Sequence, residues 1–214
     1  MQPSNTCAPT LRSSRQPPAS RCLRLTSNVR WQMQFTALPQ SDHDLIILRP
    51  LTAEDIASWY AYLTIPTVFE HTSWNLSEPS ELLRYVWLPE EFTPSSLLRF
   101  ALALRSSGQL VGTAGFHTVS PENKSAELAY DLSPSVWGKG LATYACGLLT
   151  QWAHAHVGLV RVQATVLHSN LRSACVLQRC GFEHEGHLRS YRMVRGVPGN
   201  FNLYAHVEPP PPAI

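Results

Sequence analysis

Apolar and polar positions follow a regular order from Asp44 to Val207, and this order predicts an alternation of strands and helices. Apolar runs bounded by turn residues indicate strands at 45–48, 97–104, 110–119, 125–132, 160–166, 182–193 and 201–207. Helical spacing of apolar residues predicts helices at 53–63, 77–87, 135–156 and 171–179. Residues 64–76 are expected to be irregular, and a turn at 196–199 to join the last two strands. The pattern predicts an α/β (α+β) fold with a mixed central sheet of about seven strands and helices on both faces.

The two ends of the chain differ from this patterned stretch. Residues 1–32 contain five arginines and no acidic residue, are rich in Ser and Pro, and show no apolar periodicity. Such a stretch cannot bury enough surface to offset the entropy lost on ordering. We therefore expect residues 1–40 to be a disordered extension, or the product of a start assigned upstream of Met33, with an Arg-rich transit peptide as the alternative. Residues 41–208 form the expected domain, and residues 209–214 a Pro-rich tail.

Composition narrows the class of protein. The chain has 214 residues, of which 44% are hydrophobic and 15% are charged, which suits one globular domain. A formal net charge of +2 gives no indication of nucleic-acid binding, and no apolar run approaches the roughly 18 residues of a membrane span. The five cysteines lack the spacing of a zinc site, so we expect free thiols in a reducing, cytoplasmic compartment and no metal.

The first sign of chemistry is Gly138-Lys139-Gly140, where a predicted strand gives way to the longest predicted helix. A helix N-terminus presents unpaired N–H groups and a partial positive charge, and glycines let the backbone approach a ligand closely. These features together favour phosphate binding. The segment lacks the Ser or Thr and the upstream glycine of a Walker A loop. It also lacks the third glycine of a dinucleotide-binding loop, because Thr143 stands there.

Several further short motifs follow Gly138-Lys139-Gly140 along the chain. Trp137-Gly-Lys-Gly-Leu-Ala142 is followed by Asn170-x-x-Ser173, Gly181-Phe182, Glu185-Gly-His-Leu-Arg189 and Asn202-Leu-Tyr-Ala205. With the strand Ala126–Tyr130 and the opening Arg49-Pro-Leu51, these motifs resemble the GNAT superfamily of acyl-CoA N-acyltransferases. Within it, the likeness is to the Rim-type branch, which acetylates the N-termini of ribosomal proteins. The resemblance covers about residues 44–207.

The resemblance implies a binding site for acetyl-CoA as the acyl donor. Two neighbouring parallel strands, 125–132 and 160–166, would splay apart, and the pantetheine arm would pair with the open edge of the first. The expected pantetheine contacts are Leu128, Tyr130, Leu132 and Asn170. The expected pyrophosphate contacts are Trp137, Gly138, Lys139, Gly140, Leu141 and Ala142. Many superfamily members carry Gln or Arg where this chain has Ser135, a departure that removes a side-chain contact to the phosphates and leaves the backbone contacts.

The resemblance also implies direct transfer of the acetyl group within a complex of enzyme, donor and amine. Ser173, near the thioester, would protonate the departing thiolate. Glu127 on the central strand is the first candidate for the general base, with a hydrogen-bonded structural carboxylate as the alternative. This chain departs from some Rim-type enzymes, which have an acidic residue close to the position of Arg192. Other candidates for the base are His71, His117 and Tyr191.

The expected acceptor follows from the ionisation of amines. An α-amine with a pKa near 7.7–8.0 is roughly 10–15% neutral at pH 7, whereas a lysine side chain is almost entirely protonated. A protein N-terminal amine is therefore the expected acceptor, with Trp74, His117 and Tyr191 as candidate contacts. A small-molecule amine (a polyamine, antibiotic or amino acid) and a non-catalytic acyl-CoA-binding domain are the alternatives. The chain is expected to be a monomer or a homodimer.

Overall fold

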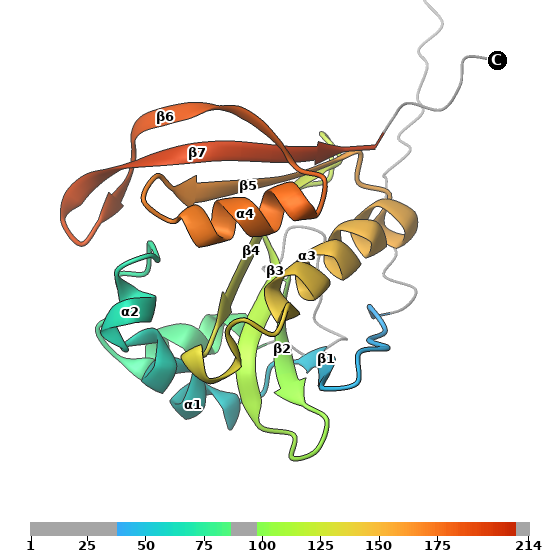
Figure 1. Ribbon diagram of the computed structural model, residues 1–214, viewed down its shortest axis with the longest axis vertical. Helices are drawn as coiled ribbons and strands as arrows, with labels where there is room; N and C mark the ends of the chain where they lie inside the picture. Colours follow the sequence, from blue (N-terminus) through green and yellow to red (C-terminus); the bar gives the residue numbers. More distant parts are fainter. Residues whose placement is uncertain (1–37, 87–97, 209–214) are drawn as a thin grey trace, which may run out of the picture. The chain divides into compact units, whose positions relative to one another are not determined.

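A seven-stranded sheet runs through the part of the chain that the computed structural model describes, residues 38–86 and 98–208 (Figure 1). The expectations for residues 1–37 and for the tail at 209–214 lie outside these described residues. The strands are β1 (Ile46–Pro50), β2 (Leu98–Leu104), β3 (Leu110–Ser120), β4 (Ser125–Leu132), β5 (Arg161–Leu167), β6 (Glu183–Val194) and β7 (Val197–Val207). Their order in the sheet is β1-β2-β3-β4-β5-β7-β6. The predicted mixed sheet of seven strands is confirmed.

The centre of the sheet is where β4 and β5 lie parallel, while every other neighbouring pair is antiparallel. These two strands pair only from Ser125 opposite Arg161 to Glu127 opposite Gln163. Beyond that point they diverge, as Figure 1 shows, although β4 continues to Leu132. The second half of β4 therefore turns an edge of backbone N–H and C=O groups toward the gap. The predicted splay of the two strands is present.

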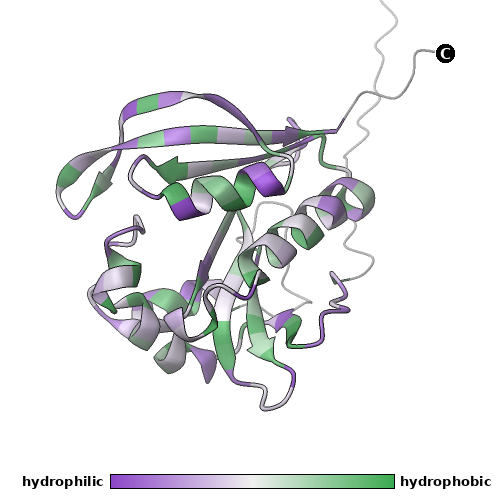
Figure 2. Cartoon of the chain, in the orientation of Figure 1, coloured by the Kyte–Doolittle hydropathy of each residue, from purple (hydrophilic) through white to green (hydrophobic). Residues whose placement is uncertain are grey.

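Helices cover the sheet on both faces, as expected. They are α1 (Asp55–Leu63), α2 (Pro66–Phe69), η1 (Pro79–Tyr85), η3 (Pro134–Val136), α3 (Leu141–Trp152), η4 (Ala153–Val157) and α4 (Leu171–Arg179). On β2, Phe100 belongs to the core shared with α3, whereas Ala101 belongs to the core shared with α1 and η1. Alternate residues of one strand thus face two separate layers. In Figure 2, β2 and β3 are mostly hydrophobic, as strands covered on both faces should be.

Two predicted helices have different boundaries in the structure. The expected helix at 77–87 is a 3₁₀-helix, η1, and its capping box is formed by Glu78 and Glu81. The expected helix at 135–156 begins only at Leu141 and ends in the π-helical turn η4. Gly138 and Gly140 both have φ near +77°, a left-handed conformation that breaks any helix entering from Ser135. Residues 64–76, expected to be irregular, contain the single turn α2.

The final hairpin turns two residues earlier than predicted. β6 and β7 are joined at Arg195 and Gly196, whose φ values are +51° and +78°. Two consecutive residues with positive φ form the tight connection that matches the twist of a hairpin. Pro198 is therefore part of β7, opposite Met193 near the hairpin end. Within the described residues, the helices are all too short or too polar to cross a membrane.

Candidate active site

Two cavities meet beside the open edge of β4. The larger one, about 740 Å³, we call the loop cavity because its lining includes Trp137, Gly138, Gly140, Leu141 and Ala142. The smaller one, about 530 Å³, we call the sheet cavity because strands β2 to β5 contribute to its lining, together with residues 71–76 and η1. The residues that line both are His71, Thr72, Tyr130, Asp131, Asn170 and Ser173. A molecule lying along β4 would thus reach from one cavity into the other.

The loop cavity ends at the N-terminus of α3. Gly140 is the N-cap residue of this helix in a left-handed conformation, and an added Cβ at Gly138 or Gly140 would meet open space. The strained φ, rather than crowding, therefore explains glycine at both positions. Trp137 is anchored by its indole N–H, which donates to the carbonyl of Leu132 at 2.9 Å. This arrangement presents the first amides of α3 to the cavity, where an anion would be stabilised.

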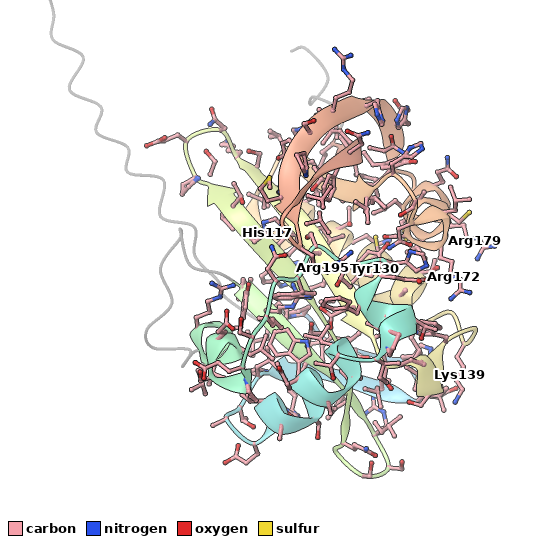
Figure 3. All side chains as sticks on the ribbon, turned by 90° about the vertical axis from the view of Figure 1, so that its left-hand side faces the viewer. His117, Tyr130, Lys139, Arg172, Arg179 and Arg195 are labelled. Carbon is pink, nitrogen blue, oxygen red and sulfur yellow. The ribbon has the colours of Figure 1, made fainter. Side chains whose placement is uncertain are left out.

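Positive side chains surround the same cavity. Arg172 and Arg179 of α4 line it, and the Arg172 guanidinium lies over the Trp137 ring at 5.2 Å. In Figure 3, Lys139, Arg172 and Arg179 extend toward the same side of the molecule. Among the described residues of this lining, the acidic one is Asp131, and it is paired with Arg99. The loop cavity is therefore suited to a ligand with several negative charges.

The wall between the cavities carries a pair of hydroxyl groups. The Tyr130 hydroxyl lies 2.8 Å from Ser173 Oγ, and it donates to the Ser173 carbonyl at 3.2 Å. Burial, the largest cause, raises the pKa of Tyr130 well above its ordinary value, so its hydroxyl keeps its proton. Asn170 caps α4 by accepting the Ser173 N–H at 3.0 Å, and it donates to the His71 carbonyl at 3.1 Å. The expected pantetheine contact is thus also the residue that fixes the start of α4.

Glu127 is buried behind the sheet cavity rather than on its lining. Its side chain is 3% exposed, and both carboxylate oxygens accept from Arg192 Nη2, at 3.0 and 3.1 Å. The Thr165 hydroxyl donates a short hydrogen bond to the same group. A guanidinium and a hydroxyl of the protein therefore already occupy this carboxylate. Sequence reasoning weighed a base against a structural carboxylate, and these contacts fit the second role.

His117 connects this carboxylate to the cavity. The imidazole lines the sheet cavity, its side chain is 26% exposed, and its Nε2 lies 3.7 Å from Glu127 Oε1. Burial is the largest cause that lowers the pKa of His117, and the neighbouring Glu127 partly opposes it. The imidazole is consequently neutral near pH 7 and can accept a proton. Sequence analysis named His117 both as an acceptor contact and as another candidate for the base.

The remaining candidates lie at different distances from the two cavities. Trp74 lines the sheet cavity and packs edge-to-face against Trp59 at 5.9 Å. His71 lines both cavities, and its Nε2 lies 2.8 Å from the carboxylate of Glu70. Tyr191 does not belong to the lining; it is 42% exposed and lies under the Arg192 guanidinium at 4.9 Å. Of the expected cavity residues, Leu128 lines the sheet cavity and Leu132 the loop cavity, whereas Lys139 is outside both linings.

Sequence reasoning missed the buried polar network beneath the sheet cavity. Asp131 accepts from Trp59 Nε1 at 3.0 Å, Tyr62 at 2.5 Å and Thr113 at 3.0 Å, and it also pairs with Arg99. A signal was available, because Glu127 and Asp131 are four residues apart on one predicted strand and must share a face. Two acids on one face of a central strand require partners, and the structure supplies Arg192 and Arg99.

Comparison with known proteins agrees with this geometry. Residues 46–183 match the family described as the acetyltransferase (GNAT) domain. The uncharacterized N-acetyltransferase YoaA of Bacillus subtilis is 27% identical over 175 residues, which cover 80% of this chain and 98% of that protein. The ribosomal-protein-serine acetyltransferase of Escherichia coli is 30% identical over 99 residues, 46% of this chain and 55% of that protein.

Solved structures show the same fold. RimL, a ribosomal L7/L12 alpha-N-protein acetyltransferase solved in complex with coenzyme A, superposes with a TM-score of 0.64. The match is 17% identical and covers 77% of this chain and 95% of RimL. At this identity the likeness concerns the fold alone. The family match over residues 46–183 and the similarity to YoaA identify the family and the activity. The chain belongs to the GNAT family and is an acetyl-CoA-dependent N-acetyltransferase.

Proposed function

We propose that this enzyme acetylates the α-amine of a protein N-terminus, with acetyl-CoA in the loop cavity and the amine in the sheet cavity. The observation that carries the proposal is the open edge of β4, which borders both cavities and includes Tyr130, hydrogen-bonded to Ser173. A thioester beside that pair would face an amine arriving from the sheet cavity. Attack then needs only proton transfers at groups already in place.

The donor would be held by backbone more than by side chains. The amides from Trp137 to Ala142 would bind the pyrophosphate at the start of α3, with Arg172 and Arg179 adding positive charge. The amide groups of the pantetheine arm would pair with the edge of β4 between Leu128 and Leu132. A backbone N–H of this edge would stabilise the oxyanion that forms on the thioester carbonyl.

The amine must lose a proton, and we assign His117 as the general base that accepts it. Its neutral imidazole lines the sheet cavity, and the Glu127 carboxylate at 3.7 Å would stabilise the imidazolium that forms. Glu127 thus contributes through His117, and Arg192 and Thr165 hold the carboxylate in position. An α-amine needs only modest help of this kind, because its pKa lies near neutral pH.

The departing thiolate receives a proton at the other side of the reaction. The amine nitrogen forms a bond to the carbonyl carbon, the C–S bond breaks, and the Ser173 hydroxyl donates its proton to the sulfur. Tyr130, protonated and 2.8 Å from Ser173 Oγ, would hold the serine hydroxyl in place, and solvent would return the proton to the serine. The E. coli relative, named for ribosomal-protein serine, supports a protein acceptor for this chain as well.

Substitution of the hydroxyl pair tests this assignment. With acetyl-CoA and a peptide that has a free N-terminus, we expect Ser173→Ala to reduce kcat by about 10²-fold, within the range for a lost proton donor. Tyr130→Phe should reduce kcat less, because the serine remains. Ser135→Ala is the matched control, since Ser135 lies outside both cavity linings. Equal rates for Ser173→Ala and Ser135→Ala would remove Ser173 from the mechanism.

A further inference from the structure

In the part of the chain that the structure describes, the acidic groups around the sheet cavity have partners inside the protein. Asp131 accepts from four side chains, among them Arg99. Glu127, just behind the lining, accepts from Arg192 and Thr165. Glu81 accepts the backbone N–H groups of Ser77 and Glu78 through a single oxygen, at 2.6 and 3.0 Å. These carboxylates are poorly placed to bind a second ammonium group on a substrate.

The aromatic part of the cavity is also occupied by a cation of the protein. Trp59, Trp74 and Tyr85 pack edge-to-face, with ring centroids 5.5 to 5.9 Å apart. The Arg99 guanidinium lies over all three rings, at 5.4, 5.5 and 5.9 Å. Aromatic faces would otherwise attract the ammonium group of a lysine or a polyamine. In this cavity the rings already form cation–π contacts with Arg99.

Two arginines of the lining keep donors for a ligand. Arg192 uses one nitrogen, Nη2, for both oxygens of Glu127, and its side chain is 32% exposed. Arg84 of η1 donates to the Tyr85 hydroxyl at 3.2 Å and lies over that ring at 5.0 Å. In the described part of the chain, Arg84 forms no ion pair with a carboxylate. Among the described residues, Arg84 and Arg192 therefore keep donor groups, whereas Asp131 and Glu127 already accept from arginines of the protein.

We propose that the acceptor is a primary amine with a carboxylate nearby and no second positive charge, and that Arg84 selects for this carboxylate. An N-terminal peptide with an acidic residue in its second or third position has this chemistry, and so does a free acidic amino acid. The inference rests on the proposed function, because it concerns the amine of the same reaction. It excludes polyamines and lysine-rich N-termini as good acceptors.

A matched set of acceptors tests the proposal. Three peptides differ only in their second residue, which is Glu, Gln or Lys, and spermidine and free glutamate complete the set. We expect kcat/KM to be about five- to tenfold higher for the Glu peptide than for the Lys peptide, from one partly exposed charge contact. Arg84→Glu should invert this preference, and Arg84→Gln should abolish it. Transfer of the acetyl group to free glutamate, and not to the Glu peptide, would identify the free amino acid as the acceptor.

The control adds the same charge at the neighbouring position. Leu83 is 48% exposed on η1 and outside the cavity lining, so Leu83→Glu should keep the wild-type preference. Transfer to peptides at equal rates, a preference for Lys or spermidine, or an unchanged preference in Arg84→Glu would overturn the inference while the proposed function stands. Absence of transfer to every amine in the set would overturn the proposed function and this inference with it.

Discussion

At the scale of single residues, the pairing of Glu127 with Arg192 decides what the central carboxylate can do. Glu127 is 3% exposed, so removing its cation leaves a buried charge with fewer partners. We expect Arg192→Gln to lower the free energy of unfolding by about 1–3 kcal/mol, less than a fully buried pair because Arg192 is one-third exposed. Denaturant unfolding measures this loss.

A double variant separates the pair from other effects of Arg192. Glu127→Gln combined with Arg192→Gln should be more stable than the sum of the single losses indicates, because the buried charge is gone. Arg189→Gln, an exposed position on the same strand, should leave the unfolding free energy nearly unchanged. Losses that simply add would mean that the two side chains do not interact.

His117 carries a second prediction, for the pH dependence of turnover. The active form is the neutral imidazole, and the pKa of His117 is lowered below its ordinary value of 6.5. With saturating acceptor, the limb of kcat that belongs to His117 should therefore lie below pH 6.5, apart from the rise above pH 7 that deprotonation of the α-amine produces. His117→Gln should remove this acid limb and reduce kcat by about 10²-fold. An acid limb that persists in His117→Gln would assign the base to another group.

Sequence and structure compare unevenly at this scale. The sequence shows that Glu127 and Asp131 share one face of a strand, but it does not show which residues pair with them. Arg192 lies 65 residues after Glu127, and Arg99 lies 32 residues before Asp131. Pairings over such distances depend on how strands meet in the sheet, which local patterns do not encode. For this reason the sequence named Glu127 without showing that a guanidinium holds it.

At the scale of elements, the N-terminus of α3 affects both the stability of the protein and the binding of acetyl-CoA. Gly140 and Gly158 have φ of +76° and +75°, and an added Cβ meets open space at each. Gly140 lies in the loop cavity, whereas Gly158 ends η4 outside both linings. Replacement by Ala should destabilise each variant by about 1–2 kcal/mol, the cost of a left-handed conformation.

The two glycine variants should differ in acetyl-CoA binding. Gly140→Ala should weaken binding at least several-fold in calorimetric titration, because any backbone shift disturbs the amides that face the pyrophosphate. Gly158→Ala should bind like the wild type. Equal binding by both variants would show that this loop does not hold the donor.

Element boundaries were predictable where a single local force sets them. The helix α4 begins and ends as predicted because Asn170 caps it and Gly181 follows it. The strand β4 also has its predicted limits. The start of α3 was placed too early, because the apolar spacing around Val136 continued through two glycines that the backbone uses for left-handed turns. The spacing of apolar residues alone does not predict a left-handed backbone conformation.

At the scale of the whole molecule, the network around Asp131 fixes helix α1 to three strands of the sheet. It joins α1 through Trp59 and Tyr62, β2 through Arg99, and β3 through Thr113. Asp131→Asn would leave the Arg99 charge buried beside a neutral amide, so we expect a loss of about 3 kcal/mol in unfolding free energy. Asp42→Asn, which removes an exposed contact to Tyr144, should unfold like the wild type.

The order of strands shows what the sequence could not provide. Strand number and the presence of helices on both faces followed from the apolar pattern. The placement of β7 between β5 and β6 did not, because it depends on pairing between segments distant in the chain. The splayed centre was expected from the family resemblance, since no local residue pattern dictates that β4 and β5 part after Glu127.

The central claim is that the acetyl group goes to an N-terminal α-amine, and product mapping tests it most directly. A peptide with a free N-terminus and one internal lysine is incubated with acetyl-CoA and the enzyme, and tandem mass spectrometry locates the acetyl group. We predict acetylation at the α-amine, with the lysine unmodified and with no product from the same peptide blocked at its N-terminus. Acetylation at the lysine, or of the blocked peptide, would contradict the account.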